Sequence, residues 1–109
     1  MSLLSQLRRG LNASQMENAR VIEQRFRGAG LPAGLAAAAI VNAIHESNLN
    51  AAAHNTSGED SAGLFQLNAR GGLGTGMSLA ERMDPVASSD KVIQEIKRLR
   101  LDQAAQDNP

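Results

Sequence analysis

The chain has 109 residues, and its eleven basic and eleven acidic side chains give a formal charge of zero. This length allows one domain with a single modest core. The balanced charge argues against a nucleic-acid partner, which needs a clustered basic excess, and the absence of cysteine excludes disulfides and thiolate chemistry. Because only two residues are aromatic, both of them phenylalanine, we expect an aliphatic core.

The sequence contains no apolar run as long as a membrane span. Its first ten residues, MSLLSQLRRG, lack an apolar core of signal-peptide length. If the protein acts outside the cytoplasm, we therefore expect another route to take it there. Residues 1–13 have mixed polarity and are predicted to form an N-terminal arm, ahead of one domain over residues 14–109.

The first predicted helix begins at Ser14, and Glu17 follows at the spacing of a capping box. Apolar side chains then recur at helical spacing and predict one buried stripe. The stripe consists of Met16, Ala19, Ile22 and Phe26. Gly28 and Gly30 are expected to end this helix, because glycine readily adopts the left-handed conformation of a helix stop.

A second helix is predicted from Ala33 to Ser47, with Pro32 at its start. Its bulk comes from Leu35, Ile40, Val41 and Ile44, with four alanines between them. A helix that is apolar nearly all round is typical of a buried central position. We therefore expect this helix to lie at the centre of the fold.

Glu46 is the only carboxylate on the second predicted helix, and it lies in the last turn. The negative end of the helix dipole and apolar surroundings would both raise the pKa of its carboxyl group. A carboxylic acid that keeps its proton near neutral pH can act as a general acid. The alternative is that the Glu46 side chain points to solvent as the helix emerges.

Residues 48–62 are polar and rich in asparagine, serine and glycine, which predicts a loop. Six side chains there could face a cleft: Asn50, His54, Asn55, Ser57, Glu59 and Asp60. A hydrolase with two carboxylates needs its second one about 5–9.5 Å from the first. Asp60 is the first choice for that role and Glu59 the second, although acidic side chains in turns often serve only local hydrogen bonding.

The next segment, Gly63-Leu64-Phe65-Gln66, is a short apolar turn. Leu64 is expected to reach the core, Phe65 to be either core or a platform for a sugar, and Gln66 to donate a hydrogen bond into a cleft. Residues 68–76 hold four glycines and predict a flexible loop without the lysine of a phosphate loop.

Two further helices are expected near the end of the chain. Ser78 and Glu81 form a second capping box for a short helix over residues 79–83, which Asp84-Pro85 ends. The last helix is predicted over residues 88–103. Its inner face consists of Val92, Ile93, Ile96 and Leu99. Because no segment alternates with period two, the predicted fold class is all-α, with about four helices and an irregular middle.

Metal chemistry is not expected from the two histidines. His45-Glu46 resembles the start of a zinc-protease motif, but that motif needs a second histidine at position 49, which is leucine. His54 lies at a poor spacing for a shared metal site. We therefore expect no metal and no cofactor.

The ordered set of Glu46-Ser47, a polar loop with Asn50, and Gly63-Leu64-Phe65-Gln66 resembles the lysozyme-like superfamily. It is most similar to the lytic transglycosylase and goose-type lysozyme branch, and to phage-borne virion lysozymes in particular. Asp84-Pro85 followed by an amphipathic helix also matches that branch. The resemblance covers residues 31–100 and implies a small helical lysozyme-like domain whose central helix ends at the catalytic glutamate.

This resemblance implies cleavage of the β-1,4 bond between N-acetylmuramic acid and N-acetylglucosamine in peptidoglycan. Glu46 would be the general acid and then the base, giving an anhydro-sugar without a cofactor, whereas goose-type hydrolysis would add Asp60. Ser47 would orient the acid or the substrate. The remaining substrate-binding residues would be Asn50, Gly63, Leu64, Phe65 and Gln66. Such an enzyme would digest the cell wall locally from a virion, alongside other virion or tail proteins, or reach the periplasm without a signal peptide.

The sequence departs from the family pattern in its last part. It has no tyrosine and lacks the later helices that close the cleft in family members. Either the chain is a minimal version of the family, or a neighbouring chain or missing domain completes the site. Alternatively, the chain is a structural virion or wall-binding module that keeps the fold without catalysis, or a helical interaction module with no cleft.

Overall fold

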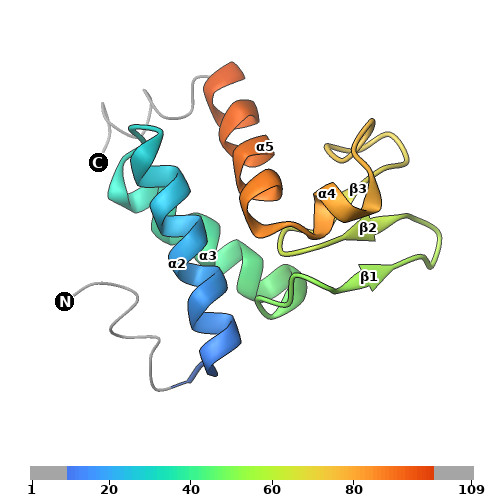
Figure 1. Cartoon of the computed structure of the whole chain (residues 1–109). Helices are drawn as coiled ribbons and strands as arrows, with labels where there is room; N and C mark the ends of the chain where they lie inside the picture. Colours follow the sequence, from blue (N-terminus) through green and yellow to red (C-terminus); the bar gives the residue numbers. More distant parts are fainter. Residues whose placement is uncertain (1–9, 100–109) are drawn as a thin grey trace.

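A computed structural model describes residues 10–99, in which the three longer helices lie on one side and a small sheet, with one short helix beside it, lies on the other (Figure 1). The helices are α2 (Ala13–Gly28), α3 (Ala33–Ser47), α4 (Leu79–Met83) and α5 (Pro85–Arg98). The strands are β1 (His54–Asn55), β2 (Ser61–Ala62) and β3 (Leu67–Asn68). The expectation of about four helices is confirmed in this range. The predicted arm lies mostly outside the described residues, and Ala13, its last residue, belongs to α2.

Helix α2 begins at Ala13, one residue earlier than predicted, because Asn12 is its N-cap. The Asn12 Oδ1 atom accepts from the backbone N–H of Gln15, and Gln15 Oε1 accepts from that of Asn12, both at 2.8 Å. Ser14 and Glu17 have the same spacing, so the sequence contains two overlapping capping boxes. The earlier one forms, and Glu17 instead lies 3.5 Å from Arg20 on the helix surface.

We expect Asn12→Ala to lower the free energy of unfolding by about 1 kcal/mol, because an alanine cannot satisfy the Gln15 backbone donor. Ser14→Ala should change it by less than about 0.5 kcal/mol, since Ser14 is an exposed helical residue. Urea denaturation followed by circular dichroism measures both variants. A larger loss in Ser14→Ala than in Asn12→Ala would place the cap at Ser14 instead.

The other end of α2 and its buried stripe are as predicted. Gly30 has φ +83°, and the backbone N–H of Leu31 donates to the Phe26 carbonyl at 3.1 Å, the long bond of a Schellman stop. All four stripe residues are buried, and Ile22 and Phe26 are fully so. Ala19, Ile22 and Phe26 join α3, the sheet region and Ile93 of α5 in one hydrophobic core.

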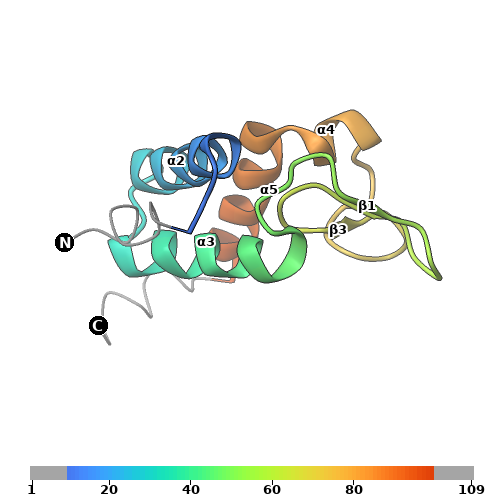
Figure 2. The ribbon, with the colours of Figure 1, turned by 90° about the horizontal axis from the view of Figure 1, so that it is seen from below.

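The central helix is α2, and the expectation that α3 is buried on all sides is wrong. α2 contacts both α3 and α5, and Figure 2 shows α3 as an outer layer beneath it. α3 buries one face, through Ala36, Ala39, Ile40 and Ala43. Its other face is open, and Val41 is 42% exposed. Four consecutive alanines let α3 lie close to α2. Their side chains are too small for a second helix or sheet to pack on the other face of α3.

The all-α expectation is wrong in the middle of the chain, where β1, β2 and β3 form an antiparallel sheet in that order. His54 pairs with Ala62, and Ala62 pairs in turn with Leu67. Each strand has only two residues, too few to show an alternating pattern in the sequence. The Gly63–Gln66 turn is the connection between β2 and β3, so the sheet places it beside the end of α3.

Helix α4 forms as predicted, with a complete capping box between Ser78 and Glu81. Hydrogen bonds from Ser78 lower the pKa of the Glu81 carboxyl from its ordinary value. α5 begins three residues before the predicted start, because Asp84 is its N-cap and Pro85 its first residue. Proline has no backbone donor to lose at that position, so it starts a helix as readily as it ends one.

The inner face of α5 is only partly as predicted. Ile93 is buried, and Val92 and Ile96 pack against the core. Leu99 is 50% exposed and caps the helix, so its expected place on the inner face is wrong. The predicted continuation to residue 103 lies outside the described residues.

Candidate functional site

The end of α3 is bonded directly to the turn between β2 and β3 through Ser47. The Ser47 Oγ atom lies 2.8 Å from the Leu64 carbonyl and 3.0 Å from the Ala43 carbonyl, so its one proton can serve either acceptor. Glu46 is the preceding residue on the same helical turn. The structure therefore brings together the Glu46-Ser47 pair and the Gly63–Gln66 turn, which the sequence places seventeen residues apart.

The Gly63–Gln66 turn is held by the carbonyl of Ala53. The backbone N–H of Gly63 donates to it at 2.8 Å, and Gln66 Nε2 donates to it at 3.1 Å. Gln66 Nε2 also donates to the Gly63 carbonyl at 3.0 Å. The expectation that Gln66 donates into a cleft is therefore wrong. Its amide nitrogen instead donates to the Ala53 and Gly63 carbonyls, which also accept from the backbone N–H groups of Gly63 and Gln66.

The side chains of the turn serve the core. Leu64 is fully buried, and Phe65 is 8% exposed and belongs to the hydrophobic core. The platform alternative for Phe65 is thereby wrong, and only its backbone can line a cleft. Phe26, the other aromatic residue, is also fully buried. Neither phenylalanine presents a ring on which a sugar could stack.

Glu46 is exposed, so the expected burial of its carboxyl group is wrong and the solvent-facing alternative holds. Among residues 10–99, no hydrogen bond or ion pair engages this carboxylate, which leaves it available to a ligand. Asn50, also exposed, uses Oδ1 to accept from the backbone N–H of Ala52 at 3.0 Å. Within the described range, its amide nitrogen makes no hydrogen bond.

Both expected second carboxylates are engaged inside the sheet region. Asp60 Oδ1 lies 2.7 Å from His54 Nε2 and 3.2 Å from a guanidinium nitrogen of Arg82, and Oδ2 lies 3.3 Å from the other. Glu59 accepts from Asn55 Nδ2 at 2.7 Å and from Ser61 Oγ at 3.0 Å. These hydrogen bonds give both acidic residues a structural role in the loop, so their presence does not require a catalytic role.

The bonds from His54 and Arg82 hold the pKa of the Asp60 carboxyl below its ordinary value of 3.8. A carboxyl whose pKa is lower in the folded state contributes stability above its unfolded pKa, and that contribution is lost as pH falls through the folded value. We therefore expect wild type to lose stability faster than Asp60→Asn below about pH 4, as the difference between them closes. Melting temperatures from pH 6 to pH 2 test this. A constant difference across that range would contradict it.

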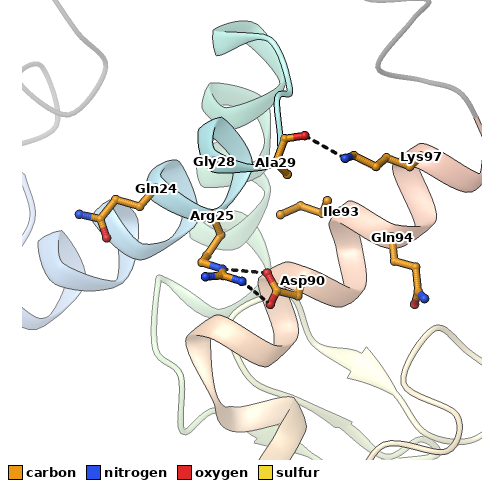
Figure 3. Close-up of a pocket in the computed structure, with 8 residues that line it drawn as sticks. All are labelled: Gln24, Arg25, Gly28, Ala29, Asp90, Ile93, Gln94 and Lys97. Carbon is orange, nitrogen blue, oxygen red and sulfur yellow. Dashed lines mark hydrogen bonds and ion pairs between the residues drawn. The ribbon is translucent and has the colours of Figure 1, made fainter.

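A groove between two helices lies away from Glu46. It holds about 440 Å³ between the C-terminal half of α2 and α5. Two contacts bridge it: Arg25 pairs with both Asp90 oxygens at 2.8–2.9 Å, and Lys97 donates to the Ala29 carbonyl at 2.8 Å (Figure 3). The groove is thus a helix-packing seam closed by its own side chains. Because α2 and α3 are antiparallel, it lies at the opposite end of the pair from Glu46.

A smaller cavity of about 290 Å³ lies at the Glu46 end of the helices. Uncharged polar residues make up most of its lining, which consists of Asn12, Ser14, Gln15, Asn48, Leu49 and Asn50. Asn48 and Leu49 both have positive φ, near +55°. The amides of Gln15 and Asn18 hold their carbonyls at 3.0 and 2.9 Å, which fixes the chain leaving α3.

Sequence reasoning missed Arg82, the one charged residue that is buried within residues 10–99. It lies on the inner side of the short helix α4, where a single turn gives too little periodicity to mark an inward position. The only local signal is the glycine at position 74, whose added Cβ would lie 2.8 Å from Arg82 Cδ.

Two further findings limit the chemistry of the described range. No group of three or more His, Cys, Asp or Glu residues there lies close enough to hold a metal ion. None of its helices combines the length and apolar character that crossing a membrane requires. Comparison of the chain with protein-family models, with curated proteins and with solved structures found no match.

Proposed function

We propose that this chain is a peptidoglycan-cleaving domain of the lysozyme-like type, acting as a lytic transglycosylase with Glu46 as its catalytic acid. The observation that carries the proposal is the bond from Ser47 to the Leu64 carbonyl at 2.8 Å. It joins the two motifs on which the resemblance rests, Glu46-Ser47 and Gly63–Gln66, into one site. The substrate would be the β-1,4 bond between N-acetylmuramic acid and N-acetylglucosamine.

In this mechanism the Glu46 carboxyl group protonates the glycosidic oxygen as the bond to the sugar breaks. The resulting carboxylate then takes a proton from a hydroxyl of the same sugar, whose oxygen bonds to the anomeric carbon and forms the anhydro ring. Glu46 ends the cycle protonated, so no second carboxylate is needed. A bound glycan strand would cover the exposed carboxyl group and remove it from water, which strengthens its interactions with the reacting atoms.

The engagement of Asp60 and Glu59 favours this non-hydrolytic route over goose-type hydrolysis. A base that activates water needs an oxygen free to accept its proton. Both Asp60 oxygens already accept from Arg82, and Oδ1 also faces His54. Glu59 is held by Asn55 and Ser61. The unengaged carboxylate of Glu46 therefore fits a mechanism with a single catalytic acid.

A second candidate is a wall-binding or structural virion module without catalysis. The burial of both phenylalanines favours its structural form, because neither ring is exposed to stack on a sugar. The open face of α3 favours it too, since the Glu46 end of the helix has one uncovered side. For either candidate, we propose delivery to the wall in a phage particle, with virion or tail proteins as partners.

Two readouts on one sample separate the candidates: co-sedimentation with purified insoluble peptidoglycan, and release of soluble fragments from it. The enzyme is expected to release fragments, and Glu46→Gln is expected to release none above background while still co-sedimenting. A binding module would co-sediment without releasing fragments in either form. A protein that neither binds nor releases fragments would contradict the enzyme and the wall-binding module, and would leave a structural virion module or a general interaction module.

A further inference from the structure

Arg82 is buried at 3% exposure, although a charged side chain is costly to remove from water. Its guanidinium group makes its bonds to one small region. One terminal nitrogen donates to the Asp60 carbonyl at 2.7 Å and to the Leu67 carbonyl at 3.2 Å, and the two terminal nitrogens reach the Asp60 carboxylate at 3.2 and 3.3 Å. A single side chain of α4 thus joins the residue before β2 to the first residue of β3.

The backbone around Arg82 is shaped to admit it. A Cβ added at Gly63 would lie 1.8 Å from the Arg82 carbonyl oxygen, so α4 packs directly on the first residue of the turn. Gly74 leaves room for the Arg82 side chain in the same way. The backbone of Arg82 therefore packs against the first residue of the turn between β2 and β3. Its guanidinium group binds the residue before β2 and the first residue of β3.

The same turn is the acceptor for the end of α3. Ser47 reaches the Leu64 carbonyl only if Gly63–Gln66 keeps its position. Arg82 binds Leu67, the residue after that turn, and Asp60, three residues before it. The contacts form one path from Arg82 through Gly63 and Leu64 to Ser47 and so to Glu46. An ammonium group could not span these acceptors, because it lacks the planar fork of a guanidinium group.

We propose that Arg82 is a positioning residue for the Glu46 site. It does not contact Glu46 within the described structure and acts through the turn, setting the position of Leu64 relative to the Glu46-Ser47 end of α3. This inference rests on the proposed function for its catalytic consequence. The structural coupling between Arg82 and the end of α3 can be tested without any activity.

The first test is catalytic and uses Arg82→Lys, which keeps the charge and loses the fork. We expect its turnover of peptidoglycan to fall about 10- to 100-fold, the scale of a small misplacement of reacting groups. Co-sedimentation with peptidoglycan should stay within twofold. Arg70→Lys is the matched control, because Arg70 is exposed and belongs to the same region, and it should match wild type. Equal turnover in Arg82→Lys and wild type, with both folded, would overturn the proposal.

The second test needs no substrate. In ¹H–¹⁵N spectra, Ser47→Ala defines the shifts that follow loss of the Ser47–Leu64 bond, chiefly at residues 45–48 and 63–66. We expect Arg82→Lys to move the amides of residues 45–48 in the same direction. Changes confined to residues 59–68 and the neighbours of Arg82 would overturn the coupling. If Arg82→Lys melts below the working temperature, Asp60→Asn takes its place. This substitution keeps the shape of the side chain but weakens its contacts with Arg82, so we expect chemical-shift changes of the same pattern and smaller size.

The two tests also separate this inference from the proposed function. If wild type releases no fragments, the enzyme proposal fails and the spectra alone decide whether Arg82 positions the end of α3. If wild type is active and Arg82→Lys leaves both turnover and the 45–48 amides unchanged, the positioning role fails and the enzyme proposal stands.

Discussion

Glu46→Gln is expected to lower fragment release from peptidoglycan by about 100- to 10,000-fold, the range that a general acid contributes. Glutamine has the same size but carries no acidic proton, so the glycosidic oxygen would leave unprotonated. The fold should be unaffected, because Glu46 is exposed and unengaged among the described residues. The free energy of unfolding should change by less than about 0.5 kcal/mol. Initial rates of fragment release and urea denaturation of the same preparations measure the two effects.

Glu17→Gln provides the matched control, because Glu17 is an exposed glutamate on α2 whose contact with Arg20 is long, at 3.5 Å. It should retain the wild-type rate. Asp60→Asn should retain at least about a tenth of that rate, since Asp60 is proposed to act only on the position of the turn. A loss in Asp60→Asn as large as that in Glu46→Gln would instead point to hydrolysis with two carboxylates.

Gly63→Ala is expected to be the most destabilising single substitution of the turn, at about 3–5 kcal/mol. Gly63 has φ +84°, where an L-residue costs about 1–2 kcal/mol. The new methyl group would also lie 1.8 Å from the Arg82 carbonyl oxygen, which belongs to the backbone and cannot rotate away. Forcing such a group into a packed site costs about 1–3 kcal/mol or more. Urea denaturation gives the free energy of unfolding directly.

Gly76→Ala isolates the clash from the backbone strain. Gly76 has the same φ of +84°, and a Cβ built there meets no atom within 4 Å. Its substitution should cost only the conformational share, about 1–2 kcal/mol. If the two alanine variants lose the same stability, the close approach of α4 to the turn is not a feature of the protein in solution.

Local patterns predicted the parts of the fold that depend on neighbours in the chain. The Ser78–Glu81 capping box, the four-residue stripe of α2 and the Gly30 stop are all satisfied within a few residues of themselves. Where two local solutions overlap, as at Asn12 and Ser14, the sequence alone did not choose between them. The same holds at Pro85, because one proline is compatible with either ending or starting a helix.

Features that depend on distant residues were not predictable in this way. α2 is the central helix because its larger side chains pack against both α3 and α5. Predicting this requires comparing the side-chain volumes of different helices, which the pattern of one segment does not allow. The strands form because turns bring short segments together. They are defined by how these segments pair, and each segment is too short to show alternating polarity in the sequence.

The candidate site divides along the same line. The sequence identified the two segments that meet, Glu46-Ser47 and Gly63–Gln66, because each carries a recognisable order of residues. It misjudged Gln66 and left Phe65 open between core and platform, because these roles depend on which backbone acceptors lie near the turn and on what the core must fill. Arg82 was missed because its role depends wholly on tertiary contacts.

The most direct test of the proposed function is mass spectrometry of the soluble fragments released from purified insoluble peptidoglycan by wild type and by Glu46→Gln. We predict anhydro-muropeptides from wild type and none from the variant. Fragments with reducing ends from wild type would contradict the non-hydrolytic mechanism and return attention to Asp60. No fragments from either protein, in preparations shown to be folded, would contradict catalysis by this chain.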